Sequence, residues 1–352
     1  MLESISACTE ENNYLSHFNT KITANDFSQT LLECKHSLSW ENYNKSLDMN
    51  FDNKNNNKFL EGLSDAERHY YLDNDYNRII NEKNNFLNQY SNDLKEVQEE
   101  GNSSEVDSLS DLFNNVKQSL ILGKNDYLDV LKDVFSNYMN FVNELRQILS
   151  NLDKYYNKKE KENQQEGMVD FDFKAFYIDL SKIIDKYKTP LGTVDDPFVF
   201  QSRLFFQHQK DGTYLRTIDG QEVHYSDKQQ VNNAVDTLEK LLRGIKGIEI
   251  TRQNSWSEHD VDVDCRARID CTDLETLLKD LSEKVSNEKE ISLNNFNLFK
   301  NTVDALDKKI NTNLDELSKK YSTANSNYDN FVKIVSSTMN TLLEMAKGFL
   351  RS

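Results

Sequence analysis

The sequence predicts a mostly α-helical protein with a small α+β domain, and three observations support this fold class. Prolines and glycines are scarce, at two and ten in 352 residues, which disfavours an all-β fold. Residues 104–160 and 291–350 carry apolar side chains at alternating three- and four-residue steps, the pattern of a coiled coil. Both prolines and six glycines fall within 168–290 or at its start, where alternating apolar residues indicate strands.

The N-terminal sequence, residues 1–101, predicts a tail followed by a helical hairpin. Residues 1–25 are polar and lack a basic segment followed by an apolar run, so we expect a disordered region without a cleaved signal peptide. An uncleaved export signal of a specialised bacterial route is the alternative. Residues 26–101 contain two amphipathic stretches joined by an Asn-rich loop, which predicts an αα-hairpin. Its first helix runs from Asp26 to Leu47, and a capping box of Ser64 and Glu67 begins the second.

Two long helices are predicted to pair as a central antiparallel coiled coil. The segment 104–160 reads as one helix of roughly fifty residues that closes at a lysine cluster near residue 160. Its Gly123 lies on the apolar seam and permits a close approach or a slight bend. The segment 291–350 keeps its seam with one stutter and has no glycine before Gly348. Because the two helices have similar lengths, we expect the mixed α/β domain, 168–290, to be inserted between them.

The inserted domain is predicted to alternate short strands and helices. Its last two strands, 248–252 and 261–269, are expected to pair with each other, and the pairing of the other strands cannot be derived from the pattern alone. The expected strands are 169–173, 198–206, 212–225, 248–252 and 261–269, and the expected helices are 176–187, 227–243 and 272–285. Asp211-Gly212 and Asp219-Gly220 are turn signals.

Composition and motifs argue against several classes of function. The net charge of −17 disfavours nucleic-acid binding, and no apolar run reaches the roughly 18 residues that span a bilayer. Asp260, Asp262 and Asp264 share a strand face, but an EF-hand would need glycine at Cys265, so a solvated face is expected. We predict that the protein has no catalytic residues and no metal site, and that it is not an enzyme. The cysteines are expected to be free thiols, with a Cys265–Cys271 disulfide as the weaker alternative.

One stretch of the C-terminal helix carries a family resemblance. Residues 317–338 read LSKKYSTANSNYDNFVKIVSST, and helical periodicity does not dictate their polar side chains. This stretch closely resembles the C-terminal helix of type III secretion needle-tip proteins, the IpaD/SipD/BipD family. Residues 109–155 resemble the other long helix of that family, and fainter similarity extends over most of 105–350.

The resemblance implies a fold and a function together. Needle-tip proteins are secreted through the type III apparatus from the bacterial cytoplasm and cap the needle at the cell surface, usually as a pentamer. They control secretion and scaffold the hydrophobic translocator proteins that enter the host membrane. Their N-terminal hairpin acts as a self-chaperone over the coiled coil. No cofactor is expected, although some members bind a bile salt between hairpin and coiled coil.

The resemblance also implies a needle-subunit binding site of polar residues off the apolar seam. Its members are Asn325, Ser326, Asp329, Asn330, Lys333, Ser336 and Ser337. A plain solvated coiled-coil face is the alternative for these residues. Two departures from the family pattern are the Arg351-Ser352 ending and a longer region over 195–225, which is either a sensor loop or a surface hairpin.

The sequence therefore predicts a needle-tip protein that acts through protein contacts, in which the needle subunit displaces the N-terminal hairpin from the coiled coil. The alternative is an unrelated coiled-coil adaptor or secreted effector that binds a host protein.

Overall fold

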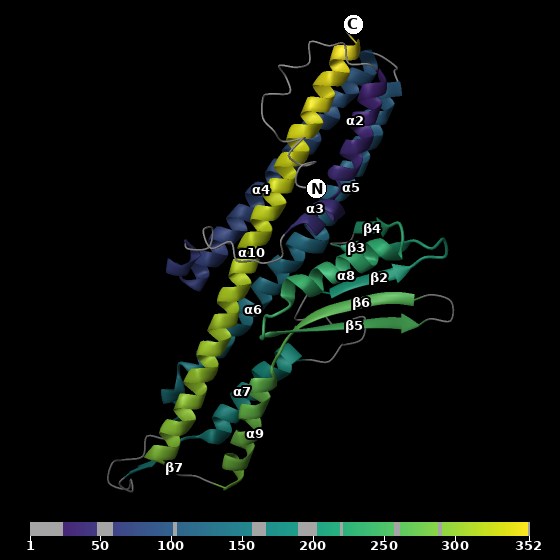
Figure 1. The fold of residues 1–352 in the computed structure, drawn as a ribbon. Coiled ribbons are helices and arrows are strands. Elements are labelled where there is room, and N and C mark those ends of the chain that lie inside the picture. The colour runs from purple at the N-terminus through teal and green to yellow at the C-terminus, as the bar shows by residue number, and fades with distance from the viewer. Residues whose placement is uncertain are drawn as a thin grey trace. The chain divides into compact units, whose positions relative to one another are not determined.

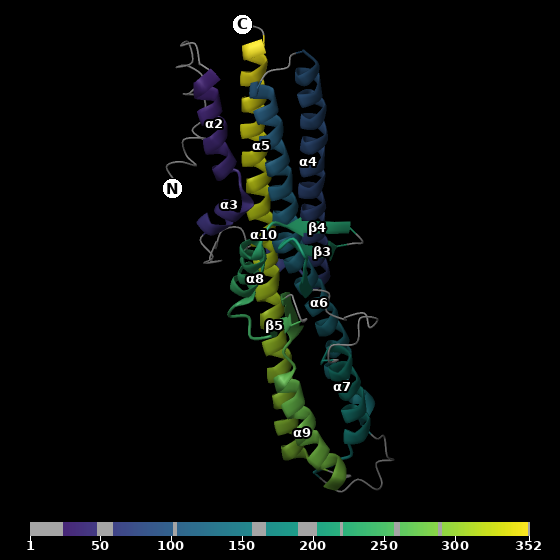
Figure 2. The same cartoon turned by 90° about the vertical axis from the view of Figure 1, so that its right-hand side faces the viewer.

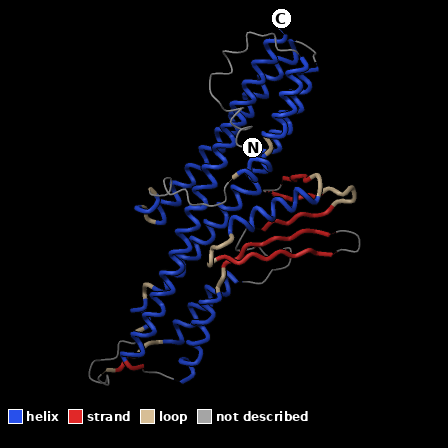
Figure 3. Tube along the Cα trace, in the orientation of Figure 1, coloured by secondary structure: helices blue, strands red, loops and turns tan. Residues whose placement is uncertain are grey.

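The computed structural model describes residues 24–47, 59–100, 104–156, 167–188, 203–218, 221–256, 261–287 and 291–350. These residues form two compact units (Figure 1). The first contains the chain up to Asp129 together with the chain from Lys320 onward, and the second contains Val130–Lys319. Helices dominate, and strands form one small sheet and one short pair (Figure 3). The predicted fold class is confirmed.

The first unit is a bundle of helices. Its elements are α2 (Ala24–Ser37), α3 (Trp40–Ser46), η1 (Leu60–Gly62), α4 (Asp65–Glu100), α5 (Ser104–Gly123), the π turn η2 (Lys124–Leu128) and the later part of α10 (Leu293–Leu350). Both α2 and α4 pack on α5, and Figure 2 shows them on opposite sides of it. The helix predicted from Asp26 to Leu47 is divided, because the backbone leaves helical geometry at Leu38 and Ser39.

The helix α4 begins as its sequence predicts. The backbone N–H of Ser64 donates to Glu67 Oε2 at 2.8 Å, and the Ser64 hydroxyl donates to the same oxygen, which confirms the capping box. The apolar stripe of α4 is buried at Leu72 and again from Ile79 onward, whereas Tyr70 and Tyr71 near the start of the helix are exposed.

The helix predicted over 104–160 is interrupted by the π turn and ends early. It continues from η2 into α6 (Asp129–Leu149), and a 3₁₀ turn, η3 (Leu152–Tyr155), follows. The lysines expected to close the helix lie outside the described residues. The side chain of Tyr328 on α10 donates to the carbonyl of Leu120 at 2.7 Å, and Asn313 donates to Tyr138 at 3.2 Å. Within the second unit, Arg146 also donates to the side-chain oxygen of Asn311, so positions that rise along α6 meet positions that fall along α10, and these two helices are antiparallel there.

The second unit holds a five-stranded antiparallel sheet in the order β4-β3-β2-β6-β5 (Figure 1). Its strands are β2 (Arg203–His208), β3 (Tyr214–Ile218), β4 (Gln221–Tyr225), β5 (Ile248–Trp256) and β6 (Val261–Ile269). The helix α8 (Lys228–Leu242) contacts both edge strands, β4 and β5, and α9 (Thr272–Asn287) follows β6. The predicted pairing of the last two strands is confirmed.

Aromatic side chains close the end of the helix pair in the second unit. The short strands β1 (Met168–Val169) and β7 (Ile291–Ser292) pair there, and α7 (Phe173–Lys188) follows β1. The ring of Phe171 lies 5.4 Å from that of Phe296, between centroids. The strand expected over 169–173 is therefore shorter than predicted, because α7 already begins at Phe173.

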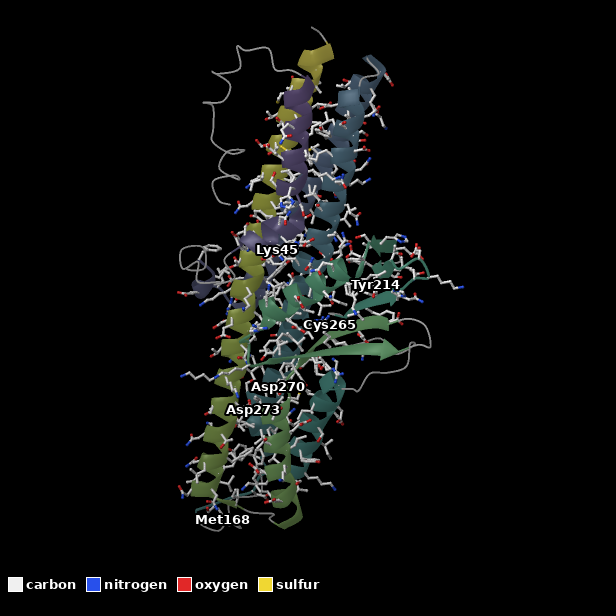
Figure 4. The ribbon with its side chains drawn as sticks, turned by 45° about the vertical axis from the view of Figure 1, so that its right-hand side comes forward. Lys45, Met168, Tyr214, Cys265, Asp270 and Asp273 are labelled. Carbon is white, nitrogen blue, oxygen red and sulfur yellow. The ribbon has the colours of Figure 1, made fainter. Side chains whose placement is uncertain are left out.

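The structure tests two predictions about side chains of β6 and of the residues that follow it. Asp264 is buried and forms an ion pair with Arg266, and Asp262 accepts the backbone N–H of His208 at 2.9 Å. The expected solvated face is therefore wrong for Asp264. Cys265, labelled in Figure 4, and Cys271 are both buried free thiols, so the alternative of a disulfide between them is wrong. Burial raises the pKa of the Cys265 thiol to about 12.

Candidate functional site

The seven predicted site residues lie along one stretch of α10 in the first unit, but they differ in exposure. Asn330, Lys333 and Ser337 are exposed, and Ser326 and Ser336 are half-buried. Asn325 and Asp329 are buried, with 0% and 8% of their surfaces exposed. The alternative of a plain solvated coiled-coil face is therefore wrong for these two residues. They lie under α4, which the sequence pattern of α10 alone cannot reveal.

Asn325 joins α10 to α4 through a backbone carbonyl. Its Nδ2 donates to the carbonyl oxygen of Leu72 at 3.1 Å. Its Oδ1 is buried and has no hydrogen-bond partner among the described residues. A buried acceptor without a donor weakens a helix contact by roughly 1–3 kcal/mol, so this contact is poorly satisfied.

Asp329 makes a second link between the two helices. The two nitrogens Nη1 and Nη2 of Arg78 lie 3.4 Å and 3.3 Å from the carboxylate oxygens of Asp329. The same guanidinium makes 2.8 Å contacts to Asp75 and Glu82 on its own helix, and Lys333 Nζ lies 2.7 Å from Asp329 Oδ2. Each partner therefore has shorter bonds within its own helix than across the interface. Long, off-ideal bonds hold less strongly, so the link is weak.

The helix α3 covers a different part of α10 with aromatic rings. Trp40 lies within 5.8 Å of the rings of Tyr127, Tyr328 and Phe331, between centroids. The hydroxyl of Tyr43 donates to the carbonyl of Asn327 at 3.1 Å, and burial raises the pKa of this hydroxyl to about 12. This contact is mainly apolar, whereas Asn325 and Asp329 meet α4 through polar groups.

The half-buried serines of the site have local partners. The Ser326 hydroxyl donates to the carbonyl of Ser322 at 3.1 Å, and the Ser336 hydroxyl donates to that of Val332 at 2.7 Å. Such bonds to the preceding turn leave the helix surface low in unsatisfied groups. Together with Asn330 and Ser337, these side chains give α10 a surface of small, uncharged polar residues suited to close helix packing.

The important partners that sequence reasoning missed come from the N-terminal helices. Leu72 and Arg78 contact site residues, and Trp40 packs on the neighbouring Phe331, although none of the three belongs to the resembling stretch. A signal existed for Trp40, which is one of only two tryptophans and lies in an otherwise polar segment. No comparable signal singles out Arg78 among the charges of α4.

The described residues contain no group of three or more His, Cys, Asp or Glu side chains that could hold a metal ion. In the same part of the chain, no helix is both long and apolar enough to cross a bilayer. The fold and the site define a coiled-coil protein with a polar helix face suited to contacts with other helices.

Comparison with known proteins identifies the family. The family model of type III secretion systems tip complex components matches residues 10–350. The chain therefore belongs to this family, the components of type III secretion tip complexes. The resemblance to needle-tip proteins is confirmed.

Two curated relatives agree with this assignment over shorter segments. The cell invasion protein SipD of Salmonella typhimurium (strain LT2) is 34% identical over 87 residues, which cover 24% of this chain and 25% of the relative. The cell invasion protein SipD of Salmonella typhi is 51% identical over 47 residues, which cover 13% of this chain and 14% of the relative. The chain thus matches a quarter or less of the length of these relatives.

Proposed function

We propose that this chain caps the type III secretion needle, controls secretion and scaffolds the insertion of a hydrophobic translocator protein into the host membrane. It leaves the bacterial cytoplasm through the type III apparatus and assembles at the needle tip on the cell surface, as a pentamer. Membership of the tip complex family supports this role. The likeness to cell invasion proteins is consistent with it.

The needle subunit binds the polar face of α10 in this proposal, through the seven residues from Asn325 to Ser337. The observation that carries the proposal is that α4 covers part of this face through weak polar contacts, at Asn325 and at Asp329. A helix of the needle subunit that offers comparable apolar contacts then takes the place of α4. The N-terminal helices act as a self-chaperone until that exchange.

The proposal includes no cofactor. A bile salt is the one small ligand that it admits, between the N-terminal helices and the coiled coil. Its binding is tested separately, by titrating the purified chain with a bile salt and following the heat released.

Co-sedimentation with purified needles tests the proposed contact. Truncation after Tyr328 would remove the contact, but it would also remove buried residues such as Phe331 and Val335, so point variants are sharper. Asn330→Arg and Ser337→Arg place bulky charge on exposed positions of α10. We expect the full chain to sediment with needles and the double variant to lose at least tenfold in affinity.

The matched control is Asn301→Arg, the same substitution at an exposed position of α10 outside the proposed contact. It should sediment like the unchanged chain. If the double variant also sediments fully, the contact lies elsewhere. If the unchanged chain itself fails to sediment with needles, the result favours the alternative function of a coiled-coil adaptor or secreted effector.

A further inference from the structure

The buried stripe of α4 contains one charged residue. Its apolar members are Leu72, Ile79, Phe86, Tyr90, Leu94 and Val97. Lys83 occupies the position between Ile79 and Phe86, four residues after one and three before the other, and only 7% of its surface is exposed. A lysine at a seam position lowers the stability of a helix pair, because its ammonium group loses water on packing.

The surroundings of Lys83 compensate its charge only in part. The nearby carboxylate is that of Asp129, whose Oδ2 accepts from Lys124 Nζ at 2.5 Å and whose Oδ1 accepts from the Tyr76 hydroxyl at 2.8 Å. Each of its oxygens therefore already accepts one hydrogen bond from another residue. Within the part of the chain that the structure describes, Lys83 makes neither a hydrogen bond nor an ion pair.

Two cations thus share one carboxylate in a partly dry interface. Burial lowers the pKa of the Lys83 ammonium, the charge of Lys124 lowers it further, and the charge of Asp129 acts in the opposite direction. The net lowering means that the protein disfavours the charged form of this lysine. A neutral side chain of similar length would fill the same space without that penalty.

We propose that Lys83 is a built-in destabilising residue that keeps α4 weakly docked on the rest of its unit. Its effect adds to that of the poorly satisfied Asn325 and the long Arg78–Asp329 contacts, so all three act on the same helix. The use of this weakness rests on the proposed function, because α4 must leave α10 for the needle subunit to bind. The weakness itself does not depend on the needle.

The test compares Lys83→Met with Lys95→Met. Methionine keeps the length and the apolar stem of lysine at both positions, and Lys95 is an exposed residue of the same helix. Backbone amide hydrogen exchange along α4, α2 and α10 reports the local opening of each helix. We expect the exchange of α4 amides to slow about tenfold in Lys83→Met and to remain unchanged in Lys95→Met.

Two outcomes overturn the inference. Unchanged exchange in Lys83→Met would show that the lysine does not weaken the docking of α4. Faster exchange would show that it stabilises the interface. Lys83→Leu is the second variant, and it should slow exchange as methionine does unless its branched end disturbs the packing.

Needle co-sedimentation of the same variant separates the inference from the proposed function. If Lys83→Met slows α4 exchange and also binds needles more weakly, the docking role of Lys83 and the displacement of α4 by the needle subunit are both supported. If it slows exchange while needle binding is unchanged, the docking role of Lys83 stands and displacement of α4 by the needle subunit is overturned.

Discussion

Gly123 and Trp40 touch so closely that a Cβ at Gly123 would lie 2.6 Å from the indole Cδ2. No side chain larger than hydrogen fits there unless the indole moves. The indole is also surrounded by Tyr43, Tyr127, Tyr328 and Phe331, so it has little room to move. The glycine on the α5 seam is therefore the place where α3 docks.

Gly123→Ala should destabilise the first unit. Alanine is better than glycine in a helix by about 1 kcal/mol, but overpacking a filled interior costs about 1–3 kcal/mol. We expect a net loss in the free energy of unfolding and a shift of the Trp40 fluorescence. Urea unfolding in a Trp256→Phe background measures both, since Trp40 is then the single tryptophan.

The matched control is Gly348→Ala, since a Cβ on this helical glycine would meet no atom within 4 Å. It should be neutral or slightly stabilising. Equal stability of the two variants would mean that Trp40 is free to shift.

Gly247 has a comparable role in the second unit. A Cβ there would lie 2.5 Å from the Tyr138 hydroxyl and 2.6 Å from Asn313 Nδ2, two groups that are hydrogen-bonded to each other. The loop before β5 thus rests on the helix pair at this glycine. A narrow cavity lined by these residues and by Asp270 and Asp273 adjoins it. The two aspartates are labelled in Figure 4.

Gly247→Ala should lower the stability of the second unit by about 1–3 kcal/mol, because the added methyl must displace the loop or break the Tyr138–Asn313 bond. Differential scanning calorimetry measures the loss. Gly62→Ala is the control, since a Cβ at Gly62 meets nothing within 4 Å. Adding Tyr138→Phe removes the clashing oxygen and should recover part of the loss, and no recovery would refute the steric account.

Elements whose side chains follow a strong periodic pattern could be predicted from the sequence. The long seam of α10, the amphipathic α8 and the paired strands β5 and β6 all appear where the pattern indicates. The capping box of Ser64 and Glu67 also forms as expected. Each of these signals is local, so it does not depend on which other segment packs against it.

Features that depend on tertiary packing could not be predicted in this way. Asn325 and Asp329 have the polarity of surface residues, and they become buried only because α4 lies over them. The same reasoning applies to Asp264, which is buried beside Arg266. The π turn after Gly123 is a change in backbone hydrogen bonding, and the spacing of apolar residues there matches an α-helix equally well.

The N-cap of α8 should make its stability depend on pH. The Asp227 carboxylate accepts the backbone N–H of Gln230 at 2.9 Å, and this bond lowers its pKa below the ordinary value of 3.8 despite slight burial. A carboxyl whose pKa is lowered by folding stabilises the folded state above its unfolded pKa. That contribution is lost as the pH falls through the folded pKa.

Asp227→Ala should therefore cost about 1 kcal/mol at pH 7, and the difference from the unchanged chain should shrink as the pH falls below about 4. Urea unfolding of both chains at pH 7 and pH 3 gives the two differences. Comparing the chains at each pH cancels the titration of the other carboxyls. Asp227→Asn, which can still accept the bond, should lose little at either pH. If the difference in unfolding free energy between Asp227→Ala and the unchanged chain grew toward pH 3, the expected direction of the pH dependence would be contradicted.

Removal of the N-terminal helices should increase self-association. Deleting residues 1–100 uncovers Phe113, whose ring lies 4.7 Å from that of Tyr90 between centroids. It also uncovers Tyr127 and Phe331, which pack on Trp40. Apolar surface of this kind is stabilised by contact with another copy. Sedimentation equilibrium over a range of concentrations should show a larger mass for the shortened chain than for the full one. Deletion of 1–23 alone leaves every described helix in place, so it should leave the number of chains per particle unchanged. A shortened chain that stays monomeric would mean that the N-terminal helices do not shield an assembly surface.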